Sequence, residues 1–197
     1  MCNVLLVTCN SDDTNLSFRR AASAAIRAVR QFDYNAPVRE RHLFSGAVPP
    51  LDRSTIDALK TSPNSRSAKQ WKTASVTDML LFEVRSADVF VITVPSVGGS
   101  IPKELKQWIE HVSLAAKATV GDRSDAGNPA LHKIALLIFA EGASIPDFSS
   151  DSADSLSYRN IREQLRSIGV AQIIELRSGS HHIQLPHDVL KLISAHA

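Results

Sequence analysis

A chain of 197 residues can bury about 70% of the surface that its unfolded form exposes, so we expect one domain, residues 1–197, that needs no cross-links. The 44% hydrophobic and 21% charged residues are those of an ordinary soluble globular protein. The net charge is only +2, and the basic residues are scattered along the sequence rather than clustered. We therefore expect no nucleic-acid partner.

The cysteine content and the N-terminal sequence indicate a cytoplasmic protein. Cys2 and Cys9 form no CxxC pair, and we interpret them as reduced thiols of a cytoplasmic protein. No apolar run is long enough to span a bilayer, and the N-terminus lacks the basic head of a signal peptide. We therefore expect no membrane partner.

The first part of the chain alternates strand-like and helix-like segments. Residues 3–8 (NVLLVT) are typical of a strand that is buried on both faces. A helix is predicted next, because apolar residues recur at helical spacing: Phe18, Ala22, Ala25 and Val29. Residues 38–44 (VRERHLF) predict a weaker strand at a sheet edge, and residues 43–52 predict a loop.

The same alternation continues to the C-terminus. A helix is predicted for residues 66–86, with its apolar positions at Val76, Met79, Leu80 and Val84. Residues 88–94 (DVFVITV) form the strongest strand pattern, and a helix from about residue 100 to 117 has Pro102 in its first turn. The remaining elements are a strand at 133–140, a helix at 158–167, a strand at 171–176 and a terminal helix from Pro186.

Five strands that alternate with helices predict an α/β fold in which helices cover both faces of a parallel sheet. The flavodoxin-like three-layer sandwich, with strand order 2-1-3-4-5, fits a chain of this size. Ligands of such sheets bind beyond the carboxyl ends of the strands, near the switch between the first and third strands. The loops at residues 8–17, 95–100 and 139–144 should therefore form the site.

The first of these loops could receive a phosphate at the start of the following helix. Thr14, Asn15 and Ser17 suit that role, although each could equally be a helix cap. Asp12 and Asp13 would repel an anion, so a phosphate requires that both carboxylates point away from it.

Cys9 ends the first strand, where a cysteine of low pKa could act as a nucleophile. Low-molecular-weight tyrosine phosphatases place their cysteine there, with an arginine six residues later. Asn15 occupies that position here, so we favour a small packed thiol over a catalytic one.

Residues 87–119 (ADVFVITVPSVGGSIPKELKQWIEHVSLAAKAT) resemble the FMN-dependent NADH-azoreductase and NAD(P)H quinone reductase family. The shared positions are Asp88, Pro95, Ile101, Pro102, Leu105, Lys106, Trp108, Ile109, Val112 and Lys117. The resemblance implies a flavodoxin-like homodimer that binds FMN and takes hydride from NADH or NADPH. It would pass two electrons to a small planar acceptor such as a quinone or an azo compound. No side chain would be required as a catalytic group, because the flavin performs the chemistry.

The resemblance also assigns cofactor-binding positions, which fall on all three loops: Cys9, Asn15, Ser17, Ser96, Val97, Gly98, Gly99, Ala140, Glu141, Gly142 and Ala143. These loops depart from the family pattern. Two aromatic rings that line the flavin in the family are missing from residues 96–99, and Glu141 replaces an arginine. The alternative is therefore a divergent flavin-free protein that has a binding or regulatory role or a different chemistry.

Other candidate residues have simpler interpretations. The three histidines after the fifth strand could bind a metal but are more simply solvent-exposed imidazoles: His181, His182 and His187. We expect His111 to be a partly exposed surface residue, and Trp108 and Ile109 to be packing residues. The loops at 47–52 and 119–130 could cover the site or a subunit interface.

Overall fold

The computed structural model describes residues 1–9, 16–44, 46, 48, 51–95, 101–120, 133–139 and 153–177. Its five strands are β1 (Val4–Thr8), β2 (Val38–His42), β3 (Val89–Val94), β4 (Lys133–Phe139) and β5 (Val170–Arg177). They form one sheet in the order β2-β1-β3-β4-β5, with every neighbouring pair parallel. The predicted fold class and strand order are confirmed.

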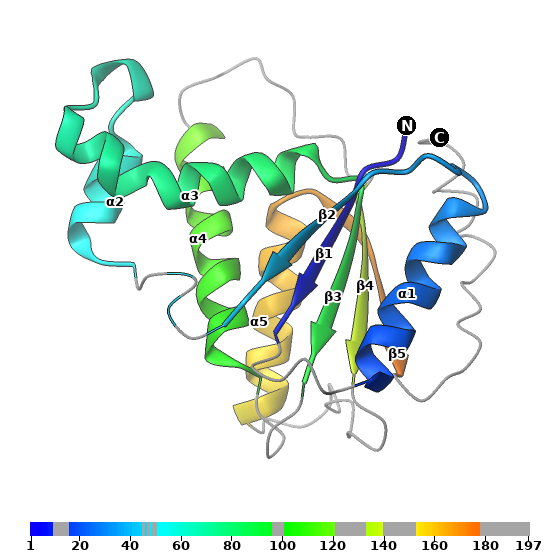
Figure 1. The fold of residues 1–197 in the computed structure, drawn as a ribbon. Coiled ribbons are helices and arrows are strands. Elements are labelled where there is room, and N and C mark those ends of the chain that lie inside the picture. Colours follow the sequence, from blue (N-terminus) through cyan, green and yellow to red (C-terminus); the bar gives the residue numbers. More distant parts are fainter. Residues whose placement is uncertain are drawn as a thin grey trace.

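Helices cover both faces of this sheet. They are α1 (Leu16–Arg30), α2 (Arg53–Lys60), α3 (Ala68–Ser86), α4 (Lys103–Val120) and α5 (Ala153–Ser167), with a short 3₁₀ turn at Pro63–Ser65. In Figure 1, α1 lies on one face, whereas α3, α4 and α5 lie on the other, and α2 packs beyond α3. The terminal helix expected from Pro186 lies outside the described residues.

Alternate residues of the central strands fill two separate cores. Leu5 and Val7 of β1 face α3, α4 and α5, whereas Val4 and Leu6 face the alanine-rich side of α1. Strand β3 is buried at every position, as expected for a strand covered on both faces. Strand β2 is half-buried or exposed throughout, which confirms its predicted place at the sheet edge.

The segment between β2 and α3 differs from the sequence-based prediction. Helix α2 was not predicted; the Asp52 side chain caps its start by accepting the main-chain N–H of Thr55 at 2.7 Å. Helix α3 begins at Ala68 rather than at residue 66, because Ser67 and Gln70 form a capping box. Met79 was placed with the apolar positions of this helix, yet its side chain is 45% exposed.

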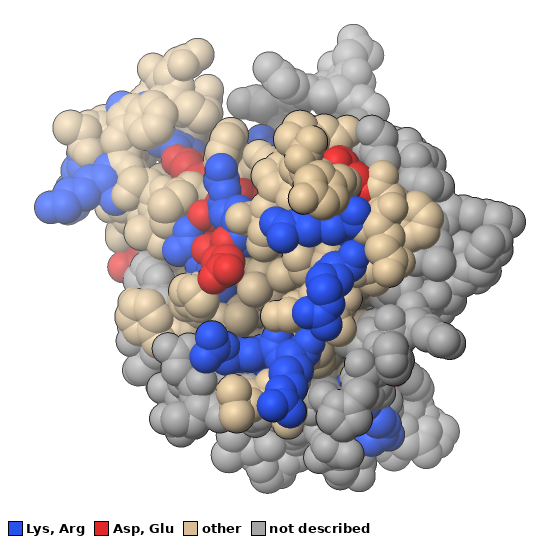
Figure 2. Space-filling model, turned by 45° about the vertical axis from the view of Figure 1, so that its right-hand side comes forward, with Lys and Arg blue, Asp and Glu red and all other residues tan. Residues whose placement is uncertain are grey.

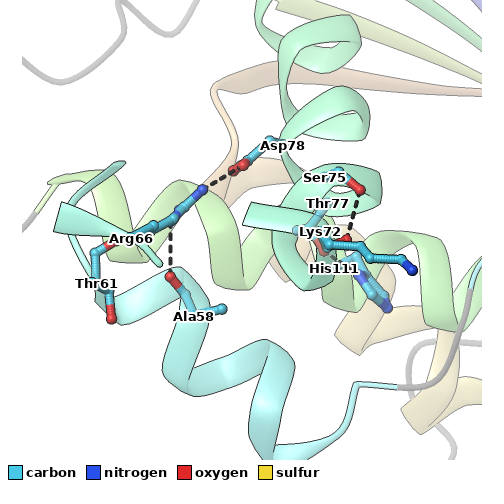
Figure 3. A network of polar contacts seen from close by, with 8 residues as sticks. All are labelled: Ala58, Thr61, Arg66, Lys72, Ser75, Thr77, Asp78 and His111. Carbon is cyan, nitrogen blue, oxygen red and sulfur yellow. Dashed lines mark hydrogen bonds and ion pairs between the residues drawn. The ribbon is translucent and has the colours of Figure 1, made fainter. Parts of the chain in front are cut away.

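Arg66 holds α2 against α3 through a buried guanidinium group whose side chain is only 3% exposed (Figure 3). Its Nε donates to the carbonyl oxygens of Ala58 at 2.9 Å and Thr61 at 3.1 Å, at the end of α2. Its Nη1 donates to Asp78 Oδ2 on α3 at 2.5 Å. One arginine thus adds a donor to two carbonyls at the helix end, one of which, that of Ala58, also accepts the Thr61 main-chain N–H.

His111 is fully buried, and its Nδ1 forms a hydrogen bond of 2.8 Å with Thr77 Oγ1 (Figure 3). The prediction of a partly exposed histidine is wrong, because α3 packs over this side of α4. In the described part of the chain, no helix is long and apolar enough to cross a membrane.

Candidate functional site

The candidate site lies at the carboxyl edge of the sheet, which is the lower edge in Figure 1. The chain leaves β1 and β3 there, and the helices α1 and α4 begin at the same edge. Strand β1 is flanked in the sheet by β2 on one side and by β3 on the other. This topological switch point is where open parallel sheets bind their ligands.

A hydrogen bond joins the ends of the two strands at the switch point. The main-chain N–H of Cys9 donates to Thr93 Oγ1 at 3.2 Å, just beyond the last paired residues of β1 and β3, Val7 and Ile92. Cys9 and Thr93 are both buried. The side chain of Thr93 therefore continues the β1–β3 pairing into the start of the first loop, a role that no sequence motif indicated.

The Cys9 thiol does not have the environment of a nucleophile. Burial raises the pKa of the thiol far above its ordinary value, and the nearby charge of Glu104 raises it further. A thiol that stays protonated is a poor nucleophile. The structure thus supports the packed thiol that the sequence favoured and gives no support to a phosphatase-like cysteine.

The start of α1 lies at the same edge of the sheet as this switch point. Ser17 is exposed in the first turn, and that turn contains no acidic residue. Main-chain N–H groups at a helix N-terminus and the positive end of the helix dipole favour a phosphate there. Of the predicted phosphate contacts, Ser17 lies exposed in this first turn, and its contact with a phosphate stays a prediction.

The side of the site next to β2 carries a polar pair that sequence reasoning missed. Thr8 Oγ1 and His42 Nδ1 form a hydrogen bond of 2.7 Å, and His42 Nε2 lies 3.3 Å from Glu40 Oε2. Thr8 and His42 are directly paired in the parallel ladder. The available signal was that each residue is the last of its strand, so that parallel register brings them together.

A partly buried polar network lies against the end of β4. The rings of Phe139 and Tyr158 meet edge to face, with centroids 5.5 Å apart. The Tyr158 hydroxyl donates to Glu175 Oε1 at 2.8 Å, and Arg162 donates to the same oxygen at 2.7 Å. Burial, and then Glu175, raise the pKa of Tyr158 far above its ordinary range, so this phenol is a structural hydrogen-bond donor.

The segment that leads into α4 is packed beneath the site. Ile101 is buried after the second loop, and the carbonyl of Pro102, the residue just before α4, accepts the Lys106 main-chain N–H at 3.2 Å. Trp108 and Ile109 are fully buried, which confirms that they are packing residues. The buried residues of this segment, among them Ile101, Trp108 and Ile109, thus belong to the core rather than to the surface.

The other predicted cofactor contacts lie outside the described residues: Asn15, Ser96, Val97, Gly98, Gly99, Ala140, Glu141, Gly142 and Ala143. The same holds for Asp12, Asp13 and Thr14, for most of the loop at 119–130 and for the three C-terminal histidines. The described residues therefore place two of the eleven predicted contacts, Cys9 at the switch point and Ser17 at the start of α1.

Comparison with known proteins agrees with the fold. A model of the Flavodoxin_2 family, described as having a flavodoxin-like fold, matches residues 2–174. An FMN-dependent NADH:quinone oxidoreductase of Aromatoleum aromaticum is 27% identical over 153 residues, which are 76% of this chain and 75% of that protein. A protein of the same name from Bordetella parapertussis is 27% identical over 79% of this chain and 73% of its own length.

Solved structures show the same architecture. An azoreductase from Bacillus anthracis superposes with a TM-score of 0.64 at 18% identity and covers 99% of this chain and 94% of its own. An FMN-dependent NADH-azoreductase of the same species, solved in complex with FMN, gives a TM-score of 0.62 at 16% identity, covering 100% of this chain and 95% of its own. At such identities, the likeness shows the fold alone.

Proposed function

Because the chain belongs to the Flavodoxin_2 family of proteins with a flavodoxin-like fold, we propose that it is an FMN-dependent NAD(P)H oxidoreductase. The acceptor is a quinone, an azo compound or a similar planar molecule, in line with the names of its relatives and structural neighbours. The observation that carries the proposal is the switch point of strand order at β1 and β3, with Ser17 exposed at the start of α1. The comparisons do not favour the flavin-free alternative.

The residues of this chain fit a phosphorylated ring in two respects. Ser17 supplies a hydroxyl at a helix start that has no acidic residue in its first turn, which suits the FMN phosphate. The Cys9–Thr93 hydrogen bond fixes the backbone where the flavin ring would enter the crevice. When bound, FMN supplies the two-electron chemistry, accepting hydride from NADH or NADPH and reducing the acceptor.

The role of the protein is to bind and orient rather than to react. The Cys9 thiol stays protonated, and Tyr158 is held by Glu175 within the core. We propose that Asn15 joins Ser17 at the phosphate. The other two loops would border the ring with the remaining predicted contacts: Ser96, Val97, Gly98, Gly99, Ala140, Glu141, Gly142 and Ala143.

The phosphate site is tested by adding a charge to it. Ser17→Glu brings a carboxylate to the phosphate and should weaken FMN binding by about 1 to 5 kcal/mol, depending on how well water screens the charge. An acidic residue in the first turn suits the helix dipole, so the fold should be retained. Ser23→Glu, at an exposed position further along α1, is the matched control. Equal FMN affinity in Ser17→Glu and wild type would contradict this site.

We propose that the protein is a cytoplasmic homodimer and that each subunit is a single domain. Two buried, free cysteines support a reducing compartment. Exposed apolar side chains on one stripe of α3, those of Trp71, Met79 and Phe82, support an interface between subunits. Sedimentation analysis should show a dimer that Met79→Lys/Phe82→Lys dissociates and Tyr34→Lys, on a different surface, does not. A monomeric wild type would contradict the dimer.

A further inference from the structure

Helix α1 presents four arginines to solvent: Arg19, Arg20, Arg27 and Arg30. All four are exposed, and α1 contains no acidic residue. Figure 2 turns the α1 side of the molecule forward and shows Lys and Arg side chains in a band across it. Basic residues that look scattered in the sequence thus gather on one face of the fold, and we refer to these four as the α1 arginine band.

Helix geometry explains the alignment. At 3.6 residues per turn, the four positions fall within an arc of roughly 100° around the helix axis. At 1.5 Å per residue, the band is roughly 16 Å long from Arg19 to Arg30. Because α1 packs on the sheet through its alanines, the opposite side of the helix stands out as a ridge of positive charge.

The stability of the fold does not account for this ridge. Within the described part of the chain, the ion pairs join other residues, and none of the four arginines takes part. Arg27 and Arg30 suit the negative end of the helix dipole, but Arg19 and Arg20 lie towards the positive end, which they do not stabilise. The helix alone would gain nothing from these two charges.

Exposed apolar side chains lie at both ends of the band. Leu16 is 58% exposed at the start of α1, and Tyr34 is 85% exposed in the turn after its end, where Phe32 is 37% exposed. Arginines pair with lipid phosphates, while aromatic and apolar side chains enter the headgroup region. We propose that the α1 arginine band docks the protein on an anionic lipid surface.

The shape of the band favours a lipid surface over a nucleic acid. In the described residues, the band is a ridge on a single helix, and its aromatic side chains lie beyond its end rather than between the arginines. Non-specific single-strand binding instead needs a basic groove with stacking rings along it. Docking requires no membrane-spanning helix, so it is compatible with the absence of such a helix among the described residues.

The proposed function gives this surface a purpose, and this step of the argument rests on that function. Apolar quinones partition from water into lipid because of the hydrophobic effect. Helix α1 begins at the edge of the sheet where the site opens, so docking through α1 holds the site close to the bilayer. The acceptors implied are therefore lipid-dissolved quinones.

Sedimentation with vesicles tests the docking directly. The full chain should bind phosphatidylcholine vesicles that contain phosphatidylglycerol and not vesicles of phosphatidylcholine alone. Arg27→Gln/Arg30→Gln should weaken that binding roughly thirtyfold, whereas the matched control Lys60→Gln/Lys69→Gln, at exposed positions of α2 and α3, should not. Binding should also disappear at about 0.5 M salt, where charges are screened within roughly 4 Å.

Three outcomes would overturn the proposal. The first is equal binding to neutral and anionic vesicles. The second is a loss of vesicle binding in Lys60→Gln/Lys69→Gln as large as that in Arg27→Gln/Arg30→Gln. The third is tighter binding of duplex DNA than of vesicles at the same salt concentration. Ser23→Glu separates this surface from the flavin site, because it puts a negative charge inside the band and should weaken vesicle binding while FMN affinity is unchanged. If the wild type binds vesicles but no FMN, the proposed function fails and the docking surface stands.

Discussion

The main-chain N–H of Cys9 donates a hydrogen bond to the side-chain oxygen of Thr93, at 3.2 Å, where the chain leaves β1 for the first loop of the site. Thr93 belongs to β3, so this bond holds together the two strands that define the switch point. The geometry of the site thus depends on a threonine whose side chain is 2% exposed.

Thr93→Val removes the acceptor and keeps the shape of the side chain. We expect a loss of about 1 to 3 kcal/mol in the free energy of unfolding, because the Cys9 N–H is left buried and unpaired. FMN affinity should fall as well, since the start of the first loop loses its anchor. Thr93→Ser keeps the oxygen and should lose only about 0.8 kcal/mol for the missing methyl group. Urea denaturation and FMN titration of both variants test this, and equal effects of Val and Ser would contradict it.

The ion pair between β2 and α3 gives a second prediction. Arg41 donates to both carboxylate oxygens of Glu83, whose side chain is only 7% exposed. Arg41→Met leaves that carboxylate buried without its partner and should cost about 2 to 4 kcal/mol of unfolding free energy. Arg41→Met/Glu83→Met removes both charges and should recover most of the loss. A double variant less stable than Arg41→Met would show that the pair itself is strongly stabilising.

Arg66 gives a third prediction, because its planar guanidinium reaches two carbonyls and one carboxylate at once. Arg66→Lys cannot reproduce this arrangement and should cost about 2 to 4 kcal/mol. Arg53→Lys is the matched control, since the Arg53 side chain is 95% exposed and lies 3.9 Å from Asp57. The control should change stability by less than about 0.5 kcal/mol. Similar unfolding midpoints for the two variants would contradict the claim that Arg66 holds α2 against α3.

The buried thiol of Cys2 should make stability fall at alkaline pH. Burial, with smaller contributions from Asp88 and Asp33, raises the pKa of Cys2 from 9.0 to about 11. Below pH 9, the thiol is protonated in both the folded and the unfolded chain, so its full contribution is present. Between pH 9 and 11, the unfolded chain loses the proton first, and about 1 to 3 kcal/mol of stability is lost.

Urea denaturation across this pH range compares the wild type with Cys2→Ala, which should lose less stability because it lacks the titrating thiol. Val4→Ala is a control that loses packing in the same core without a titrating group, and its stability should fall with pH as steeply as that of the wild type. Parallel curves for Cys2→Ala and the wild type would contradict the assignment to Cys2.

Much of the fold could be predicted because strand patterns are local. Each predicted strand matches an observed one to within two residues, and the polar pattern of residues 38–44 correctly indicated a sheet edge. Helix α2 was missed because it has only eight residues, although Asp52 is a good helix cap that could have revealed it. The exposure of Met79 and of His111 was predicted wrongly because it depends on how α3 packs on α4 and α2. The periodicity of one helix does not show which of its sides a second or third helix covers.

The site could be located from the sequence but only partly detailed. Strand order fixed the switch point, and Cys9 and Ser17 lie beside it. Thr93 and His42 were missed because each forms a hydrogen bond with another part of the chain, Thr93 with Cys9 just after β1 and His42 with Thr8 of β1. Such contacts depend on parallel register, which a single strand pattern does not contain.

Titration of the purified chain with FMN tests the central claim most directly. We expect flavin fluorescence to be quenched as one FMN binds per chain, NADH to bleach the bound flavin, and a quinone to restore its absorbance. Flavin that stays fully fluorescent with the folded chain, or bound flavin that NADH does not reduce, would contradict the claim that this crevice is the site of a flavin-dependent reductase.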